Sequence, residues 1–339
     1  MWIASSLETV KTPTIIALGN FDGVHQGHQT VIAPVVEAAT AWADAVPTVV
    51  TFYPHPQEFF TGQKRLLLTP IPEKADYLQQ LGIQQLVLVP FNLALSSLTP
   101  SEFVEQILVE ALQARWISVG QDFRFGHQRQ GTVTDLEQIA AKRGISVEVA
   151  PLHLQQGERI SSSTIRAALS GGELRRANAL LGRAYSLTGE VVRGQQLGRT
   201  IGFPTANLQI AAEKFLPCSG VYSVWAESEA IGRQPAVMNL GNRPTVNGQQ
   251  LTVEVHLLDW FGDLYGQQLS VSLQAFQRPE QKFAGLDELK AQIAQDAQQA
   301  RLDLLGSASG NSIASPIPGM IAGTGRISGN SAGTIERTA

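Results

Sequence analysis

The segment "GNFDGVHQGH" (19–28) holds the residues whose types and spacing most directly suggest chemistry: two histidines three positions apart among three glycines. It follows the apolar run 12–18 and precedes a stretch, 29–43, with helical apolar spacing. Helix N-termini present free N–H groups that bind phosphate, and glycines let a phosphate approach the backbone. We expect His25 and His28 to donate to phosphate oxygens there. A glycine-rich turn with solvated histidines is the alternative, and the chain contains no GxxxxGK[ST] loop.

A second segment, "ISSSTIRAAL" (160–169), places hydroxyl side chains before a predicted helix that carries Arg166. Serine in that position usually caps the helix. An arginine beside it can also clamp a polyphosphate through charge-assisted hydrogen bonds. Because the His-x-Gly-His segment lies in the same half of the chain, we interpret Ser162, Ser163 and Arg166 as further phosphate ligands.

The first half of the chain must position these segments. Apolar runs typical of strands alternate with helical patterns, which indicates a parallel sheet covered on both faces. The expected strands are 12–18, 46–53, 83–91, 115–120 and 145–152, and the expected helices are 29–43, 71–82, 99–112 and 135–144. Ligands of such sheets bind beyond the carboxyl ends of the strands, which is where 19–28 falls.

The second half has a different rhythm. Strand patterns follow one another without helices between them, which predicts a small antiparallel barrel or sandwich. The expected strands are 187–194, 220–228, 233–241, 251–260 and 268–278, and a helix over 286–305 follows. We therefore expect one domain over 1–184, a second over 185–305, and a disordered Gly/Ser-rich tail over 306–339.

Two more segments carry candidate site residues. Thr205 and Asn207 alternate, so in an extended segment their oxygens share one face and suit Mg²⁺. A barrel loop with hydrogen-bonding side chains is the reading that this spacing alone favours. Glu254 and His256 share a face of a predicted strand, where Glu254 would be a general base for a hydroxyl or simply an exposed strand residue.

Composition limits the function classes. The 339 residues suffice for two domains, and the net charge of −4 without a strongly basic stretch argues against a nucleic-acid partner. Cys218 is the only cysteine, which excludes an intramolecular disulfide and a cysteine-based zinc site and fits a reducing cytoplasm. We find no secretory signal and no run of about 18 apolar residues, so no membrane association is expected.

The first half resembles the FMN adenylyltransferase module of bacterial FAD synthetases. The resemblance covers 14–184 and rests on "GNFDGVHQGH", "TFYPHP", "GQDFRFG" and "ISSSTIR". It implies a nucleotidylyltransferase, Rossmann-like fold, in which the FMN phosphate attacks the α-phosphorus of ATP and pyrophosphate leaves. The site residues it implies are Gly19, Phe21, Gly23, His25 and His28 around the triphosphate, Ser162, Ser163 and Arg166 on the pyrophosphate, and Asp122 near the nucleotide.

Five residues of that half have weaker interpretations. Asp22 is either a cap of the loop or functional, and His55 either contacts flavin or fixes a turn. Asp122 stands where the family places a polar residue, often Asn, and its role stays open. His127 and His153 are expected on the surface.

The second half resembles riboflavin kinase over about 185–305. The matching segments are "GRTIGFPTANL", "PCSGVYSVW", "MNLGNRPTV", "EVHLLDWFGDLYG" and "FQRPEQKF". The resemblance implies a six-stranded antiparallel barrel in which Thr205 and Asn207 bind Mg²⁺ and ATP phosphates. It implies that Glu254 takes the proton of the riboflavin 5′-hydroxyl, that Gly198 binds nucleotide, and that Arg278 lies near the flavin.

Together these resemblances indicate a bifunctional flavin-synthesising enzyme that uses riboflavin, FMN, ATP and Mg²⁺ in the cytoplasm. Homo-oligomerisation stays open. A monofunctional enzyme or a non-enzymatic flavin carrier would each predict a missing motif residue in one half, and none is missing. Adenylyltransferases for pantetheine phosphate or nicotinamide mononucleotide share His-x-Gly-His, but would not carry a second domain with the Thr205–Asn207 segment and Glu254.

Overall fold

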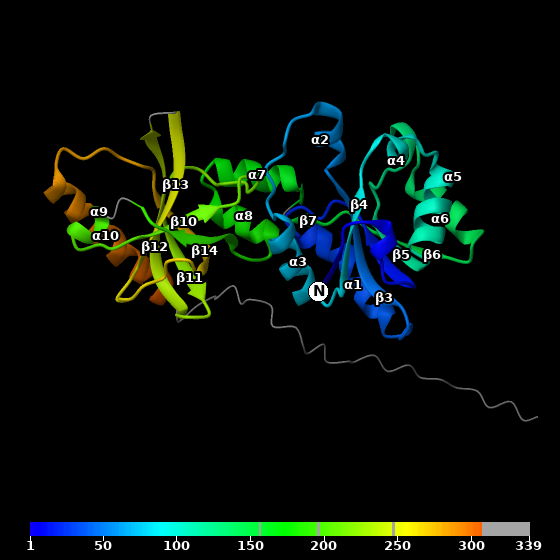
Figure 1. Cartoon of the computed structure of the whole chain (residues 1–339), viewed down its shortest axis with the longest axis horizontal. Coiled ribbons are helices and arrows are strands. Elements are labelled where there is room, and N and C mark those ends of the chain that lie inside the picture. The colour runs from blue at the N-terminus through cyan, green and yellow to red at the C-terminus, as the bar shows by residue number, and fades with distance from the viewer. Residues whose placement is uncertain (156, 195–196, 246–247, 307–339) are drawn as a thin grey trace, which may run out of the picture.

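The N-terminal half is built on a six-stranded parallel sheet in the order β1-β4-β3-β2-β5-β6. The computed structural model describes residues 1–306 except 156, 195–196 and 246–247 (Figure 1). The strands are β1 (Trp2–Ala4), β2 (Thr14–Leu18), β3 (Val46–Tyr53), β4 (Gln85–Pro90), β5 (Ala114–Gly120) and β6 (Ser146–Ala150). The predicted parallel sheet is confirmed, and the predicted tail lies outside the described residues except for Gly306.

Helices cover both faces of this sheet, because successive residues of a buried strand point to opposite sides. Ile15 of β2 packs into one apolar cluster and Ile16 into the other. The helices are α1 (Gln26–Ala39), α2 (Pro56–Thr61), α3 (Ile71–Gln80), α4 (Leu93–Ser97), α5 (Pro100–Glu102) continued by a π-helix (Phe103–Ala111), and α6 (Val133–Ala141). Short 3₁₀ turns span Leu7–Thr9 and His127–Arg129.

The strand order reverses at β2. The chain continues from β2 to β3 on one side, whereas β5 lies on the other side of β2. The loops that leave the carboxyl ends of β2 and β5 therefore diverge to opposite faces and leave a crevice between them. The sheet topology thus places the segment 19–28 at the natural ligand-binding edge.

The C-terminal half is a closed antiparallel barrel in the order β10-β13-β12-β11-β14-β9, followed by helix α10. Its elements are β9 (Tyr185–Val192), α9 (Leu197–Thr200), β10 (Ala206–Ile210), β11 (Gly220–Ser228), β12 (Gly232–Thr245), β13 (Gly248–Leu257), β14 (Gln268–Arg278) and α10 (Leu286–Leu305). Val253 and Val255 fill the interior. The predicted barrel is confirmed, including the six strands that the resemblance implied.

Several elements differ from the sequence-based expectations. The helix expected over 29–43 begins at Gln26 and ends at Ala39, because His25 caps its N-terminus. The patterns did not indicate α2 or the hairpin of β7 (Leu154–Gln155) and β8 (Glu158–Arg159). Elements this short carry too few residues for a periodic apolar pattern.

Two helices, α7 (Ser162–Ser170) and α8 (Leu174–Leu181), lie between the sheet and the barrel (Figure 1). Leu169 and Leu181 belong to the same apolar cluster as the barrel residue Leu273. Asn178 of α8 donates to the carbonyl of Leu273 at 2.9 Å and accepts from the N–H of Tyr185 at 2.8 Å. The apolar core of the barrel therefore extends into α7 and α8.

A second contact between the halves is made by main chain. The N–H of Leu67 donates to the carbonyl of Glu213 at 2.6 Å, and the N–H of Phe215 donates to the carbonyl of Leu67 at 2.8 Å. The buried Lys214 forms an ion pair with the partly buried Glu73 beside this bridge. Within the part of the chain that the structure describes, none of the helices has the length and apolar character needed to cross a bilayer.

Candidate active sites

The loop between β2 and α1 has an unusual backbone. Phe21 and Val24 have φ values of 49° and 41°, in the left-handed region that β-branched Val24 rarely adopts, and Gly23 has φ 91°. The surroundings hold this conformation: the N–H of Gly23 donates to Thr69 Oγ1 at 2.9 Å, and Arg183 donates to the carbonyls of Gly23 and Val24 at 2.7 and 3.1 Å. Strain that is held from several sides is typical of functional loops.

His25 and His28 form a stacked pair at the start of α1, with ring centroids 3.5 Å apart. His25 Nδ1 accepts the backbone N–H of His28 at 3.2 Å, which leaves the proton of a neutral His25 ring on Nε2. Burial lowers the pKa of His25 to about 4, and it also lowers the pKa of His28. Both rings are therefore neutral at pH 7. His28 Nδ1 is buried without a hydrogen-bond partner among the described residues.

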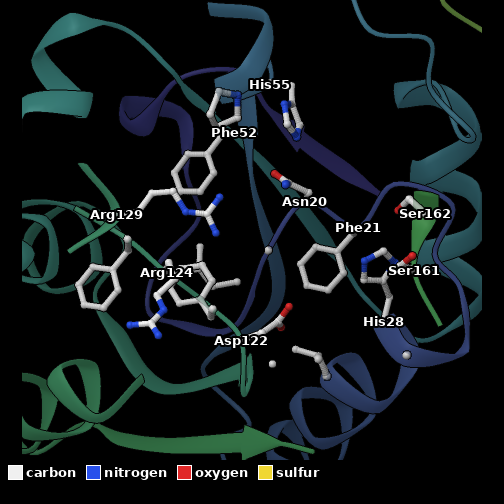
Figure 2. A pocket seen from close by; sticks show the side chains of 18 of the residues that line it. Asn20, Phe21, His28, Phe52, His55, Asp122, Arg124, Arg129, Ser161 and Ser162 are labelled. Carbon is white, nitrogen blue, oxygen red and sulfur yellow. The ribbon is translucent and has the colours of Figure 1, made fainter. Parts of the chain in front are cut away.

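A cavity of about 800 Å³ opens beside this pair at the carboxyl edge of the sheet (Figure 2). One end is polar, and Figure 2 shows Phe21, His28, Ser161 and Ser162 there. The other end combines phenylalanines with Arg124 and Arg129, which Figure 2 shows beside Phe52. Its lining includes Phe52, Phe60, Phe91, Phe103, Phe123 and Phe125. A pocket with this division suits a flat ring system that carries a phosphate.

Most of the predicted residues of this half line the cavity. Those it brings together are Gly19, Phe21, His25, His28, Asp122, Ser162 and Ser163. Gly23 and Arg166 are not part of the lining. Gly23 instead packs against Leu68, because an added Cβ at this position would lie 2.9 Å from the Leu68 side chain.

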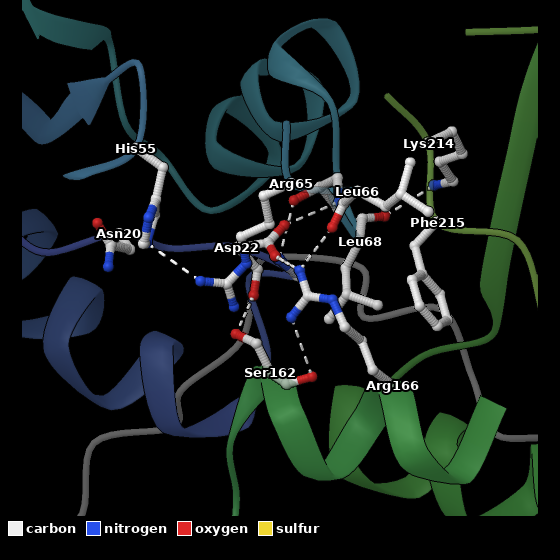
Figure 3. Close-up of polar contacts among 12 residues, drawn as sticks. Asn20, Asp22, His55, Arg65, Leu66, Leu68, Ser162, Arg166, Lys214 and Phe215 are labelled. Atoms are coloured by element: carbon white, nitrogen blue, oxygen red, sulfur yellow. Dashed lines mark hydrogen bonds and ion pairs between the residues drawn. The ribbon is translucent and has the colours of Figure 1, made fainter. Parts of the chain in front are cut away.

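Arg166 is engaged by protein groups on the far side of the loop (Figure 3). It forms an ion pair with Asp22 and donates to the carbonyls of Leu66 at 2.9 Å and Ser162 at 3.3 Å. Asp22 also accepts the N–H of Thr69 at 3.2 Å. Asp22 thus ties the loop to α7, and contact of Arg166 with a polyphosphate stays a prediction.

Asp122 and His55 both lie in the lining. Asp122 pairs with Arg159. His55 caps α2 by accepting the N–H of Gln57 at 3.0 Å, and its Nε2 lies 3.2 Å from Arg65 Nη1. His55 therefore fixes a turn, as one interpretation predicted, and also lines the cavity, whereas its contact with flavin stays a prediction.

Of the two histidines expected on the surface, both are exposed, but His153 also lines the cavity. Sequence reasoning missed further lining residues. They are Asn20, Arg65, Arg124, Arg129 and the aromatic wall. The alternation of aromatic and basic residues in "FRFG" was the one signal that could have indicated them. In the structure Phe123 and Phe125 line the cavity and stack with ring centroids 5.7 Å apart.

The second group of predicted residues lies on the barrel. In strand register, Glu254 of β13 stands opposite Asn207 of β10 on one side and Asn239 of β12 on the other. Since the neighbours Val253 and Val255 point inward, this row lies on the outer face.

The Asn207 amide packs against the backbone of Gly194. An added Cβ at Gly194 would lie 2.4 Å from Asn207 Nδ2, so a larger side chain would displace the amide. The tight fit fixes where the Asn207 side chain lies on the outer face.

The segment before β10 is held against the same face. His256 Nδ1 lies 2.8 Å from the carbonyl oxygen of Pro204, and its ring meets Phe203 edge-on at 5.6 Å. An added Cβ at Gly198 would lie only 2.3 Å from the carbonyl oxygen of Phe203, which requires glycine there. Thr205 follows directly, so the structure brings Gly198, Thr205, Asn207 and Glu254 to one region.

Arg278, which was expected near the flavin, is paired with a carboxylate of the protein. It forms a two-point ion pair with Asp296 of α10, with Nε–Oδ1 and Nη2–Oδ2 distances of 2.9 and 2.6 Å. This pair fastens α10 to β14. A flavin contact of Arg278 stays a prediction.

The comparisons with known proteins match the two halves of the chain to two different families. A family model described as FAD synthetase matches residues 7–164, and one described as riboflavin kinase matches 181–304. The bifunctional riboflavin kinase/FMN adenylyltransferase of Escherichia coli K12 is 40% identical over 290 residues, which cover 85% of this chain and 91% of that protein. The chain belongs to this bifunctional family.

A second relative of the family agrees with this assignment, and one solved structure shares the fold. The bifunctional enzyme of Pseudomonas fluorescens is 39% identical over 85% of this chain and 92% of its own length. A crystal structure named as a macrolide-efflux protein from Streptococcus pneumoniae superposes with a TM-score of 0.80 at 30% identity, covering 88% of this chain and 98% of that one. That likeness is one of fold.

Proposed function

We propose that the two sites described above carry the two activities of the family, each at its own group of residues. Riboflavin and ATP give FMN and ADP on the outer face of the barrel, where Asn207 stands opposite Glu254 and Thr205 lies two positions before Asn207. We call these three residues the kinase row. FMN and a second ATP give FAD and pyrophosphate at the cavity of the sheet half. The observation that supports the cavity most strongly is its division into a histidine-lined polar end and an aromatic end.

In the adenylyl transfer, an oxygen of the FMN phosphate attacks the α-phosphorus of ATP and the bond to the β-phosphate breaks. No protein nucleophile is needed, so the chain contributes positioning and stabilisation of negative charge. The neutral His25 and His28 rings donate N–H groups to the phosphates, together with the hydroxyl of Ser163. Ser162 Oγ donates to the main-chain carbonyl of Asp22 at 2.8 Å, so its contact with a phosphate stays a prediction. The phenylalanine end holds the isoalloxazine ring, and Arg166 supports the loop through Asp22.

In the kinase reaction, the Glu254 carboxylate accepts the proton of the riboflavin 5′-hydroxyl, whose oxygen attacks the γ-phosphorus while ADP leaves. Thr205 and Asn207 offer neutral oxygens, and no group of three or more His, Cys, Asp or Glu suited to a metal occurs among the described residues. That donor set fits Mg²⁺, which keeps waters and shares substrate phosphates. When bound, Mg²⁺ neutralises phosphate charge.

The remaining assignments are part of the same proposal. We take the boundary of the two domains at 184/185, Mg²⁺ as the ion of both steps, riboflavin, FMN and ATP as the substrates, and FAD as the final product. We place the protein in the cytoplasm without a nucleic-acid or membrane partner, and its oligomeric state is left to measurement.

The test is chromatographic separation of flavins during incubation of the whole protein with riboflavin, ATP and Mg²⁺. FMN that appears first and FAD that follows would support both assignments. FMN alone would mean that the sheet half is inactive. Conversion of added FMN but not of riboflavin would mean that the barrel half is inactive, and no conversion of either would favour a flavin carrier.

A further inference from the structure

Arg65 faces the cavity from the segment between α2 and α3. Its Nη1 lies 3.2 Å from His55 Nε2 and 3.5 Å from Gln57 Oε1, so both contacts are to neutral groups (Figure 3). Throughout the described residues, no carboxylate lies within ion-pair distance of this guanidinium. Because a guanidinium carries five N–H donors, several remain for a ligand.

Arg166, by contrast, has protein partners for its charge and for its N–H donors. Its guanidinium has the carboxylate of Asp22 and two main-chain carbonyls, its side chain is only 16% exposed, and it is absent from the cavity lining. Burial and the Arg166 charge lower the pKa of Arg65. The wall of the cavity therefore holds a guanidinium that forms no ion pair of its own, although the nearby carboxylates of Asp22 and Glu58 partly offset the effect of the Arg166 charge.

The main chain of Arg65 is nevertheless firmly placed. Its N–H donates to Glu58 Oε1 at 2.6 Å. The carbonyl of the next residue, Leu66, accepts from Arg166, and Leu67 is bridged to the barrel half. A side chain with a fixed main chain and a guanidinium outside any ion pair is suited to binding a ligand anion with little loss of entropy.

We propose that Arg65 binds a phosphate of the adenylyltransferase substrates directly, either the phosphate of FMN or the part of ATP that leaves as pyrophosphate. This rests on the assignment of the cavity to FAD synthesis. The two arginines then have separate tasks: Arg65 contacts the ligand, and Arg166 positions the segment of Arg65 through the carbonyl of Leu66. Both phosphate sources satisfy the same chemistry, so the experiment must distinguish them.

The experiment compares Arg65→Gln and Arg65→Lys with Arg115→Gln as matched control. Arg115 lies on β5 and pairs with Asp44 at 2.8 Å, outside the cavity lining. On the full-length protein, the KM values for FMN and ATP are measured in FAD synthesis, and the KM for pyrophosphate is measured in the reverse reaction. Kinase activity and thermal unfolding are recorded alongside.

For Arg65→Gln we expect a rise of about 10- to 100-fold in the KM of one phosphate ligand, since a hydrogen bond to a charged group is lost. Arg65→Lys should recover part of it, whereas kinase activity and unfolding should match Arg115→Gln. A rise for FMN alone identifies the FMN phosphate, and a rise for ATP and pyrophosphate identifies the leaving group. KM values for all three ligands within twofold of the control would overturn the proposal.

His28→Ala separates this outcome from failure of the site assignment. If Arg65→Gln behaves as the control while His28→Ala loses FAD synthesis, only the role of Arg65 is refuted. If both variants make FAD normally, the assignment of the cavity is refuted as well.

Discussion

The two sites of this chain are built in opposite ways. The adenylyltransferase cavity lies where the strand order of a parallel sheet reverses, so the topology itself opens a crevice before any side chain is chosen. The kinase row lies on the outside of a closed barrel whose interior is filled by apolar side chains. A filled barrel offers no crevice, so the segment before β10 must be fastened against its outer face.

This difference predicts which changes are local and which are shared. Changes at the chemical groups of one site should leave the other site working, because no residue belongs to both. Changes at the junction of Leu67 and Lys214 should affect both halves, because main chain of each half is hydrogen-bonded there.

The largest expected effect is the loss of the general base in the barrel. Glu254→Gln should lower riboflavin phosphorylation by about 10²- to 10⁴-fold, since proton acceptance typically contributes that much. FAD formation from added FMN should stay at the wild-type rate. Both rates are measured by separating the flavins, and a parallel loss of the two activities would contradict two separate sites.

The reciprocal change is His28→Ala. Removing one preorganised donor to the transition state should lower FAD formation by about 10²- to 10³-fold, while riboflavin phosphorylation continues and FMN accumulates. His127→Ala, at an exposed histidine outside the cavity lining, is the matched control. Normal FAD formation in His28→Ala would remove the histidine pair from the mechanism.

The junction should show itself in stability rather than in chemistry. Lys214→Met leaves the Glu73 carboxylate, whose side chain is only 14% exposed, without its partner, which should lower the free energy of unfolding by about 3 kcal/mol. Adding Glu73→Gln should recover much of that loss, because the stranded charge disappears. Chemical denaturation of both variants checks this, and additive losses in the double variant would show that the pair is not coupled.

The neutral histidine pair lies in the sheet half, so we expect the stability of that half to fall at acidic pH. The pKa of His25 falls from 6.5 to about 4 on folding, so stability is complete above pH 6.5 and is lost as pH falls toward 4. The loss attributable to His25 is about 3 kcal/mol. His25→Asn keeps a helix-capping side chain but cannot titrate, so its stability should fall less steeply with pH.

Denaturation at several pH values between 7 and 4 measures this slope. His127→Asn controls for the removal of an exposed histidine. Equal slopes in His25→Asn and wild type would mean that folding does not lower the pKa of His25.

The same contrast explains what the sequence could predict. β3, β11, β14 and α10 begin and end at the expected residues, because long apolar periodicities define them. β10 has five residues in a Gly/Pro-rich neighbourhood, and the pattern did not reveal it. Its presence was implied only by the family resemblance.

Partners were harder to predict than positions. The sequence identified Arg166 as a cation near phosphate, but Asp22, its carboxylate, lies 144 positions earlier. Arg65 carried no recognisable motif, and only the fold brings it to His55. The sequence therefore predicted which residues lie near the ends of strands. It did not predict which groups pair with each charged side chain, because those pairs form only in the folded chain.

The smallest predicted effect concerns His256, which holds the carbonyl of Pro204 beside the kinase row. Loss of one hydrogen bond is worth about 1 kcal/mol, so His256→Ala should lower riboflavin phosphorylation by roughly tenfold or less. The loss should appear as a higher Mg²⁺ and ATP requirement, because the displaced segment carries Thr205. His256→Asn offers an amide N–H in a similar place and should recover part of the affinity, while FAD formation from FMN should be unchanged in both. If His256→Ala instead lowered kcat at saturating Mg²⁺ and ATP, the histidine would act on the chemistry of Glu254 and not on the loop, and the outer face of the barrel would hold a preformed site much like the cavity of the sheet.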